Sequence, residues 1–161
     1  MRIWHISKNH TCRIRSTGSG NAGVLQSLCA EDRLPDKAPV LALEDELTLT
    51  QMMKVMAEAI AGIMWECAAK TYASPIGMRV TKDGEEVYTR LSEGMGAPNL
   101  EWLLRKEKVV NKTGHSSFCV FLDSFGNDKY KDMIDDETYG VVGGSFTLVI
   151  NNEVSGTFTC T

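Results

Sequence analysis

The sequence predicts an α+β fold: a single, mostly antiparallel sheet with helices packed on it. Two observations predict it. Two segments show helical periodicity, and a hairpin pattern follows each of them. Because a hairpin pairs its strands antiparallel, two hairpins separated by helices join most simply into one antiparallel sheet covered by helices. With 161 residues, the chain has the size of a single domain.

The first predicted helix covers residues 48–71. Thr48 belongs to the residue types that cap helix N-termini, and Gln51 lies three residues on as a capping-box partner. Apolar residues then recur at helical spacing and predict a stripe that faces the core. This stripe consists of Met52, Met56, Ile60, Ile63 and Cys67. Pro75 prevents the helix from continuing further.

A hairpin is predicted at residues 76–91. Apolar and other residues alternate from Ile76 to Val80, and Asp83-Gly84 supplies a tight turn. The second helix is expected to start at Asn99, an N-cap residue type, and to end at Gly114. Helix and hairpin together form the first half of the predicted domain.

The second half ends in another hairpin, at residues 145–160, with its turn at Asn151-Asn152. Periodicity leaves residues 118–122 open between a short strand and a helical turn. The polar, acidic residues 123–138 predict a surface loop with one turn of helix at most. The last strand is expected to form an edge of the sheet, covered by a helix or a partner subunit.

Residues 1–40 are expected to be irregular, and the folded domain to occupy residues 41–161. The first 30 residues contain four basic residues and no acidic one, a composition shared by organelle transit peptides and by flexible tails. They lack the continuous apolar core of a secretory signal. We therefore expect a cytoplasmic protein, with organelle targeting as the minor alternative.

Composition excludes several classes of function. The net charge of −4 argues against nucleic acid as a partner, and no apolar run approaches the roughly 20 residues that span a membrane. The five cysteines are Cys12, Cys29, Cys67, Cys119 and Cys160. No pair has C-x-x-C spacing, so no metal site is predicted, and a reducing compartment is expected. Cys67 and Cys119 stand among apolar residues and are expected in the core.

Three segments, in this order, resemble the HbpS/GlcG-like heme-degrading-domain family. The first is the long helix that leads into the Asp-Gly hairpin. The second matches the pattern N-x-x-W-[IL]-x-R-K…V-V…H-S-S of an uncharacterised branch, with its residues at 99–106, 109–110 and 115–117. The third is Tyr139-Gly-x-x-Gly143-Gly144-Ser145-Phe146, followed by a hairpin. Together the three segments cover about residues 43–161.

This resemblance implies a profilin-like antiparallel sheet and a symmetric homo-oligomer. Some members of the family bind heme or a related tetrapyrrole. Two departures stand out: Thr147 replaces a proline that the family favours, and the chain ends at Thr161, where members continue into a C-terminal helix. The domain is therefore expected either to lack this helix or to pack differently there.

His115 is the only histidine of the predicted domain and a suitable axial ligand for heme iron. Its alternative role is a helix-end histidine that hydrogen-bonds carbonyl groups. Arg105 could clamp a carboxylate or propionate. Its neighbour Lys106 points about 100° away on the helix, so the two cannot both face one ligand. Either residue could instead lie on a solvated face or in a subunit interface.

The other marked residues of the motifs are expected to be structural or to lie in an interface. They are Asn99, Trp102, Gly143 and Gly144. The chain contains no nucleophile elbow, P-loop or dinucleotide-binding fingerprint and no evident acid–base pair, so an enzyme is not favoured. The sequence thus predicts a small oligomeric binding domain for heme or a related tetrapyrrole. A non-enzymatic oligomeric scaffold for protein partners is the alternative, and a heme-degrading enzyme ranks last.

Overall fold

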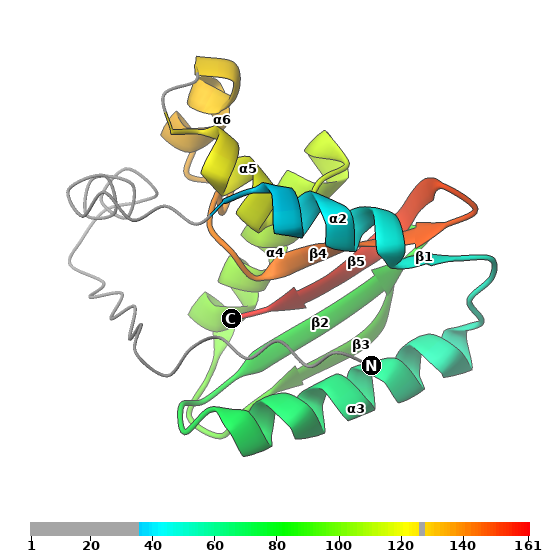
Figure 1. Cartoon of the computed structure of the whole chain (residues 1–161). Helices are drawn as coiled ribbons and strands as arrows, with labels where there is room; N and C mark the ends of the chain where they lie inside the picture. The colour runs from blue at the N-terminus through cyan, green and yellow to red at the C-terminus, as the bar shows by residue number, and fades with distance from the viewer. Residues whose placement is uncertain (1–35, 126–127) are drawn as a thin grey trace.

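The computed structural model describes residues 36–125 and 128–161, which form one five-stranded sheet with five helices packed on it (Figure 1). The strand order is β1-β4-β5-β2-β3, and every neighbouring pair is antiparallel except β1 with β4. The predicted α+β fold with a mostly antiparallel sheet is therefore confirmed. In chain order the elements are α2 (Ala38–Glu46), β1 (Thr48–Leu49), α3 (Lys54–Thr71), β2 (Gly77–Lys82), β3 (Glu85–Leu91), α4 (Ala97–Thr113), α5 (Ser117–Asp123), the 3-10 turn η1 (Asp128–Tyr130), α6 (Lys131–Asp135), β4 (Ser145–Ile150) and β5 (Glu153–Cys160).

One face of the sheet is apolar and packs against α3. Successive strand residues point to opposite faces, so Met78 and Val80 of β2 share this face. They join Leu148 of β4 and the buried α3 residues Ala57 and Ala61 in one hydrophobic cluster. The small alanines allow the helix to lie close to the sheet.

The opposite face of the sheet is lined by hydroxyl groups and packs against α4. Strand pairing aligns Thr81, Thr157 and Thr147 in one row across three strands, and Thr159 and Ser145 continue it in the next row. Four of these hydroxyls bond in pairs, at 2.9 Å between Thr81 and Thr157 and 2.7 Å between Ser145 and Thr159, whereas the buried hydroxyl of Thr147 has no partner among the described residues. α4 therefore covers a polar layer, whereas α3 covers an apolar one.

Two predictions about the first helix are wrong. Thr48 does not cap it: Thr48 and Leu49 form β1, which pairs with β4, and α3 begins at Lys54. Strand pairing at the edge of the sheet thus replaces local capping. The predicted stripe is wrong in part: Met52 is buried and Ile60 packs against the core, but Met56, Ile63 and Cys67 are exposed.

The last strand is also placed differently from the prediction. β5 lies between β4 and β2 and is hydrogen-bonded on both sides, so it is a central strand. The edges are β1 and β3 instead. Both hairpins and the second helix lie where the sequence predicts them, and Gly114 ends α4 in the left-handed conformation with a φ of 73°.

A smaller helical layer lies beyond the C-terminal end of α4. Residues 118–122, which periodicity left open, are helical and belong to α5, whereas α2 begins at Ala38, three residues before the expected domain start. The acidic segment forms η1 and α6. Residues of α4, α5 and η1 share a second hydrophobic cluster, which includes Val109, Phe121 and Tyr130. Among the helices described, none has the length and apolar character required to cross a membrane.

Candidate functional site

The first turn of α4 carries two of the marked residues. The helix begins at Ala97, so Asn99 is not the N-cap but the third helical residue. Its Oδ1 accepts a hydrogen bond of 3.0 Å from the backbone N–H of Gly96. Trp102 lies one turn further on and is partly buried. Asn99 thus fixes the start of the helix from inside its first turn.

Arg105 stacks on Trp102, one turn away on the same helix. Its guanidinium carbon is 4.5 Å from the centre of the indole ring, within cation–π range. Its Nε is buried and has no hydrogen-bond partner among the described residues. An open hollow beside it is lined by Leu104, Arg105, Lys108 and Thr138, together with three glutamates. Arg105 is therefore held against Trp102 with part of its charge facing a mixed-charge hollow.

Lys106 points to the opposite side, into the polar layer between α4 and the sheet. It is 7% exposed, and its Nζ donates a hydrogen bond of 2.9 Å to the carbonyl of Cys160. Burial lowers the pKa of its amino group. Gly144, with a φ of 126°, passes so close that an added Cβ would lie 2.7 Å from Lys106 Nζ. Lys106 thus links α4 to the last strand, away from the surface.

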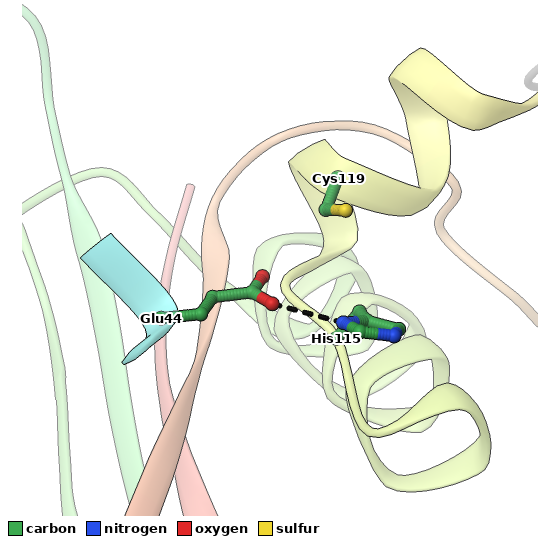
Figure 2. A group of neighbouring side chains, drawn as sticks. All are labelled: Glu44, His115 and Cys119. Carbon is green, nitrogen blue, oxygen red and sulfur yellow. Dashed lines mark hydrogen bonds and ion pairs between the residues drawn. The ribbon is translucent and has the colours of Figure 1, made fainter. Parts of the chain in front are cut away.

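His115 lies in the turn between α4 and α5, directly after Gly114. Thr113 holds this turn, because its hydroxyl accepts a hydrogen bond of 3.2 Å from the His115 N–H. The imidazole Nδ1 is 2.9 Å from Oε2 of Glu44, which projects from α2 (Figure 2). The His115 side chain is 45% exposed, whereas that of Glu44 is 9% exposed. A buried carboxylate therefore orients a half-exposed imidazole.

The residues after His115 complete this arrangement. The second oxygen of Glu44 accepts a hydrogen bond of 2.7 Å from the Ser116 N–H. Ser116 Oγ in turn caps α5 by accepting from the Cys119 N–H at 3.2 Å. This cap places Cys119 beside Glu44 and His115. Burial, reinforced by Glu44 and Asp123, raises the pKa of the Cys119 thiol to about 11, so Cys119 by itself is no nucleophile at neutral pH.

The structure does not bring the three predicted ligand-binding residues together. Arg105 faces Trp102, Lys106 faces the sheet, and His115 lies ten residues beyond Arg105, about 15 Å along a helical path. It brings His115 together with Glu44 instead, which sequence reasoning missed. The two are 71 residues apart, and no local pattern connects them.

The cysteine predictions have mixed outcomes. Cys119 is 1% exposed, as expected for a core residue, but Cys67 is exposed on α3. Cys12 and Cys29 lie outside the described residues.

The glycine pair lies between α4, α5 and the sheet. An added Cβ at Gly143 would lie 3.2 Å from the side chain of Phe118.

Comparison with known proteins agrees with this architecture. No family model matches the chain. It is 27% identical over 120 residues to a UPF0303 protein of Streptomyces avermitilis, and the match covers 72% of this chain and 73% of that protein. Its fold is similar to that of the Ybr137w protein, with a TM-score of 0.71 and 17% identity over 89% of this chain and 85% of the other. It is also similar to the ORFY protein of Klebsiella pneumoniae, of the DUF336 family, with a TM-score of 0.57 and 12% identity over 68% of this chain and 77% of the other.

These relatives show the fold class. They are consistent with the HbpS/GlcG-like resemblance and support a family of small uncharacterised domains. Because the structural likenesses fall below 25% identity, they carry the fold alone. Any function of this chain therefore has to be argued from its own residues.

Proposed function

We propose that this protein is a small oligomeric binding domain of the HbpS/GlcG-like group, and that it binds heme or a related tetrapyrrole at His115. The observation that carries the proposal is the hydrogen bond between His115 Nδ1 and Glu44. Histidines that bind metals usually donate their second ring nitrogen to a carboxylate or carbonyl, which fixes the ring and makes the ligating nitrogen more basic. Here Glu44 performs this role and leaves Nε2 to bind iron.

The exposure of the two side chains fits an axial ligand. Glu44 is nearly buried, so its carboxylate is held in place, while 45% of the His115 side chain is exposed. Two open hollows lie elsewhere, one beside Arg105 and one beside Thr81 and Asn111, and neither includes His115. A planar ligand at His115 would therefore lie on the surface or at a subunit boundary, which suits a domain that functions as an oligomer.

Lys106 has no part in this proposal, because its amino group is buried against the carbonyl of Cys160. Arg105 could meet an acidic group only of a ligand that extends along α4, or of one held by a neighbouring subunit. The proposed site thus consists of His115 as ligand and Glu44 as the group that orients it.

A hemin titration followed by Soret absorption tests the proposal. We expect a saturable shift with one hemin per chain in the wild type and its loss in His115→Ala. Glu44→Gln should bind hemin more weakly, by about 10-fold, because the ring loses its charged partner. The matched control is the double variant His5→Ala/His10→Ala, which removes the other two histidines and should titrate like the wild type. An unchanged Soret titration in His115→Ala would remove the proposal.

The second candidate function is a non-enzymatic oligomeric scaffold, and the outer face of α3 favours it. Large apolar side chains are exposed along this helix and next to it, and we call this set the α3 apolar face. It consists of Leu47, Met53, Val55, Met56, Ile63, Met64 and Tyr72, each 36–63% exposed. Apolar side chains exposed in such number along one helix often mark an interface. A second copy of the chain is the partner that the resemblance implies.

A further inference from the structure

A carboxylate, an imidazole and a thiol converge at one point between three elements. Glu44 comes from α2, His115 from the turn after α4, and Cys119 from α5 (Figure 2). One ligand atom from each lies within 4.8 Å of the other two. Figure 2 shows the Cys119 sulfur next to the pair that Glu44 and His115 form. His115 and Cys119 are four residues apart, whereas Glu44 is 71 residues from His115, so the tertiary fold brings Glu44 to this local pair.

These three donors are the set that zinc prefers. Zn²⁺ binds cysteine sulfur at about 2.3 Å, histidine nitrogen at about 2.0–2.1 Å and carboxylate oxygen at about 2.0–2.2 Å. In a tetrahedral site, these bond lengths place ligand atoms about 3.3–3.6 Å apart. The 2.9 Å between Glu44 and His115 is already shorter than this, and the remaining separations, up to 4.8 Å, require a contraction of about 1 Å.

The surroundings provide support on one side and access on the other. Cys119 is 1% exposed and the Glu44 side chain 9%, whereas the His115 side chain is 45% exposed. The Ser116 N–H holds the second oxygen of Glu44, which is the kind of outer contact that orients metal ligands. The three side chains would therefore bind an ion on its protein-facing side. A fourth coordination position would face solvent and could be taken by water.

A hydrogen-bonded cap without an ion explains less of this arrangement. It accounts for the contact between Glu44 and His115 and leaves the Cys119 sulfur with packing as its only role. It also leaves α2 weakly held, because none of its residues is fully buried. Apart from Glu44, α2 is held by the ion pair of Lys37 with Asp123 and by Val40, which packs against the second hydrophobic cluster. A metal ion at this point would fasten α2 to both α4 and α5.

We propose that Glu44, His115 and Cys119 form a binding site for a divalent transition-metal ion of the zinc type. The sequence predicts no metal site because it lacks local ligand spacing; here each ligand comes from a different element. The proposal does not rest on tetrapyrrole binding. It uses the nitrogen of His115 that faces Glu44, whereas an axial heme ligand would use Nε2. Cys119→Ser separates the two, because it should lose the ion and keep hemin binding.

Titration of the full chain with Co²⁺ tests the site, because cobalt replaces zinc and reports a bound thiolate through a sulfur-to-metal charge-transfer band. We expect one Co²⁺ per chain with this band, loss of the band in Cys119→Ser, and at least 10-fold weaker binding in Glu44→Gln and His115→Ala. Cys67→Ser, at an exposed thiol of α3, is the matched control and should behave like the wild type. The double variant Cys12→Ser/Cys29→Ser should also keep the band.

Two results would overturn the proposal: a charge-transfer band that persists in Cys119→Ser, or one that disappears in Cys12→Ser/Cys29→Ser.

X-ray absorption of the wild-type zinc adduct covers the case in which Cys119→Ser does not fold. We expect one sulfur neighbour at about 2.3 Å and nitrogen or oxygen neighbours at about 2.0–2.2 Å. A shell without sulfur, or with two or more sulfurs, contradicts the proposed ligand set.

Discussion

Among single residues, Lys106 departs most from its expected role. A basic residue next to Arg105 is expected to be solvated or to bind a ligand. Lys106 is instead buried, and its amino group contacts the carbonyl of Cys160. A signal for this was present: Leu103, Lys106 and Val110 follow the helical spacing of one face, and the two apolar residues mark that face as buried. Burial of an ammonium group costs free energy, because it gives up its contact with water.

Lys106 should therefore make stability depend on alkaline pH. Its pKa is lowered in the folded state, so between that value and about 10.5 the unfolded chain binds more protons and stability rises with pH. Lys106→Met removes this titration at similar side-chain length. We expect the free energy of unfolding of Lys106→Met, relative to the wild type, to fall as pH rises from 8 to 10 in urea titrations. A difference that is constant with pH would contradict this assignment.

Two glycines should respond to alanine in opposite directions. A Cβ at Gly156 would lie 2.0 Å from the carbonyl oxygen of Thr81, so β5 or β2 would have to move. We expect Gly156→Ala to destabilise the protein by about 1–3 kcal/mol or more. Gly62 in α3 has no atom within 4 Å of the added group, so Gly62→Ala should stabilise by about 1 kcal/mol. Denaturant unfolding of both variants checks the pair, and equal effects would refute the close approach at Gly156.

At the level of elements, α2 depends on its polar contacts. Because it has no fully buried residue, the bonds of Glu44 to His115 and Ser116 provide much of its attachment. Hydrogen bonds to a charged group contribute about 1.5–3 kcal/mol, which corresponds to at least about 10-fold in a local opening equilibrium. Sequence reasoning did not find this helix at all, since it has only a weak apolar stripe and begins beside Pro39.

Glu44→Ala should therefore loosen α2 alone. We expect its amide hydrogens to exchange about 10-fold faster or more, while those of β2 and β5 keep their wild-type rates. The exposed Glu46→Ala, in the same helix, serves as the control and should change neither. Uniformly faster exchange across the sheet would show that Glu44 stabilises the whole fold instead.

The elements that the sequence predicts well are those with a local cause. The Asp83-Gly84 and Asn151-Asn152 turns have positive φ and define both hairpins, and Gly114 ends α4. The long helix was found, but its buried side was not. Ala57 and Ala61 allow the helix to pack closely on the sheet, Trp65 is buried beside them, and Met56, Ile63 and Met64 remain exposed.

At the scale of the whole molecule, we expect the α3 apolar face to determine the assembly state, since the sheet beneath α3 is already covered.

 Within this face, Val55 and Ile63 are the most exposed side chains of the helix itself, at 63% and 60%. Charged side chains such as Glu58 and Lys70 are exposed on the same helix. This pattern, an apolar patch with a charged rim, is typical of a subunit interface.

Aspartate at the centre of the α3 apolar face should separate the subunits. We expect the wild type to form an oligomer in size-exclusion chromatography with light scattering, and Val55→Asp/Ile63→Asp to be a folded monomer. Both side chains are at least 60% exposed, so the substitutions leave the core intact. Lys108→Asp, exposed on α4, is the control and should keep the wild-type mass. A wild type that is itself monomeric would contradict the oligomer and weaken the scaffold function.

By itself, the sequence determined the fold class, both hairpins and the second helix. Each of these depends on turn chemistry, periodicity or a short motif, all of which act between near neighbours in the chain. Only the tertiary structure decided that β5 is central, that Lys106 is buried, and that Glu44 meets His115 and Cys119. The physical reason is that these depend on contacts between distant segments, which form when the helices pack on the sheet.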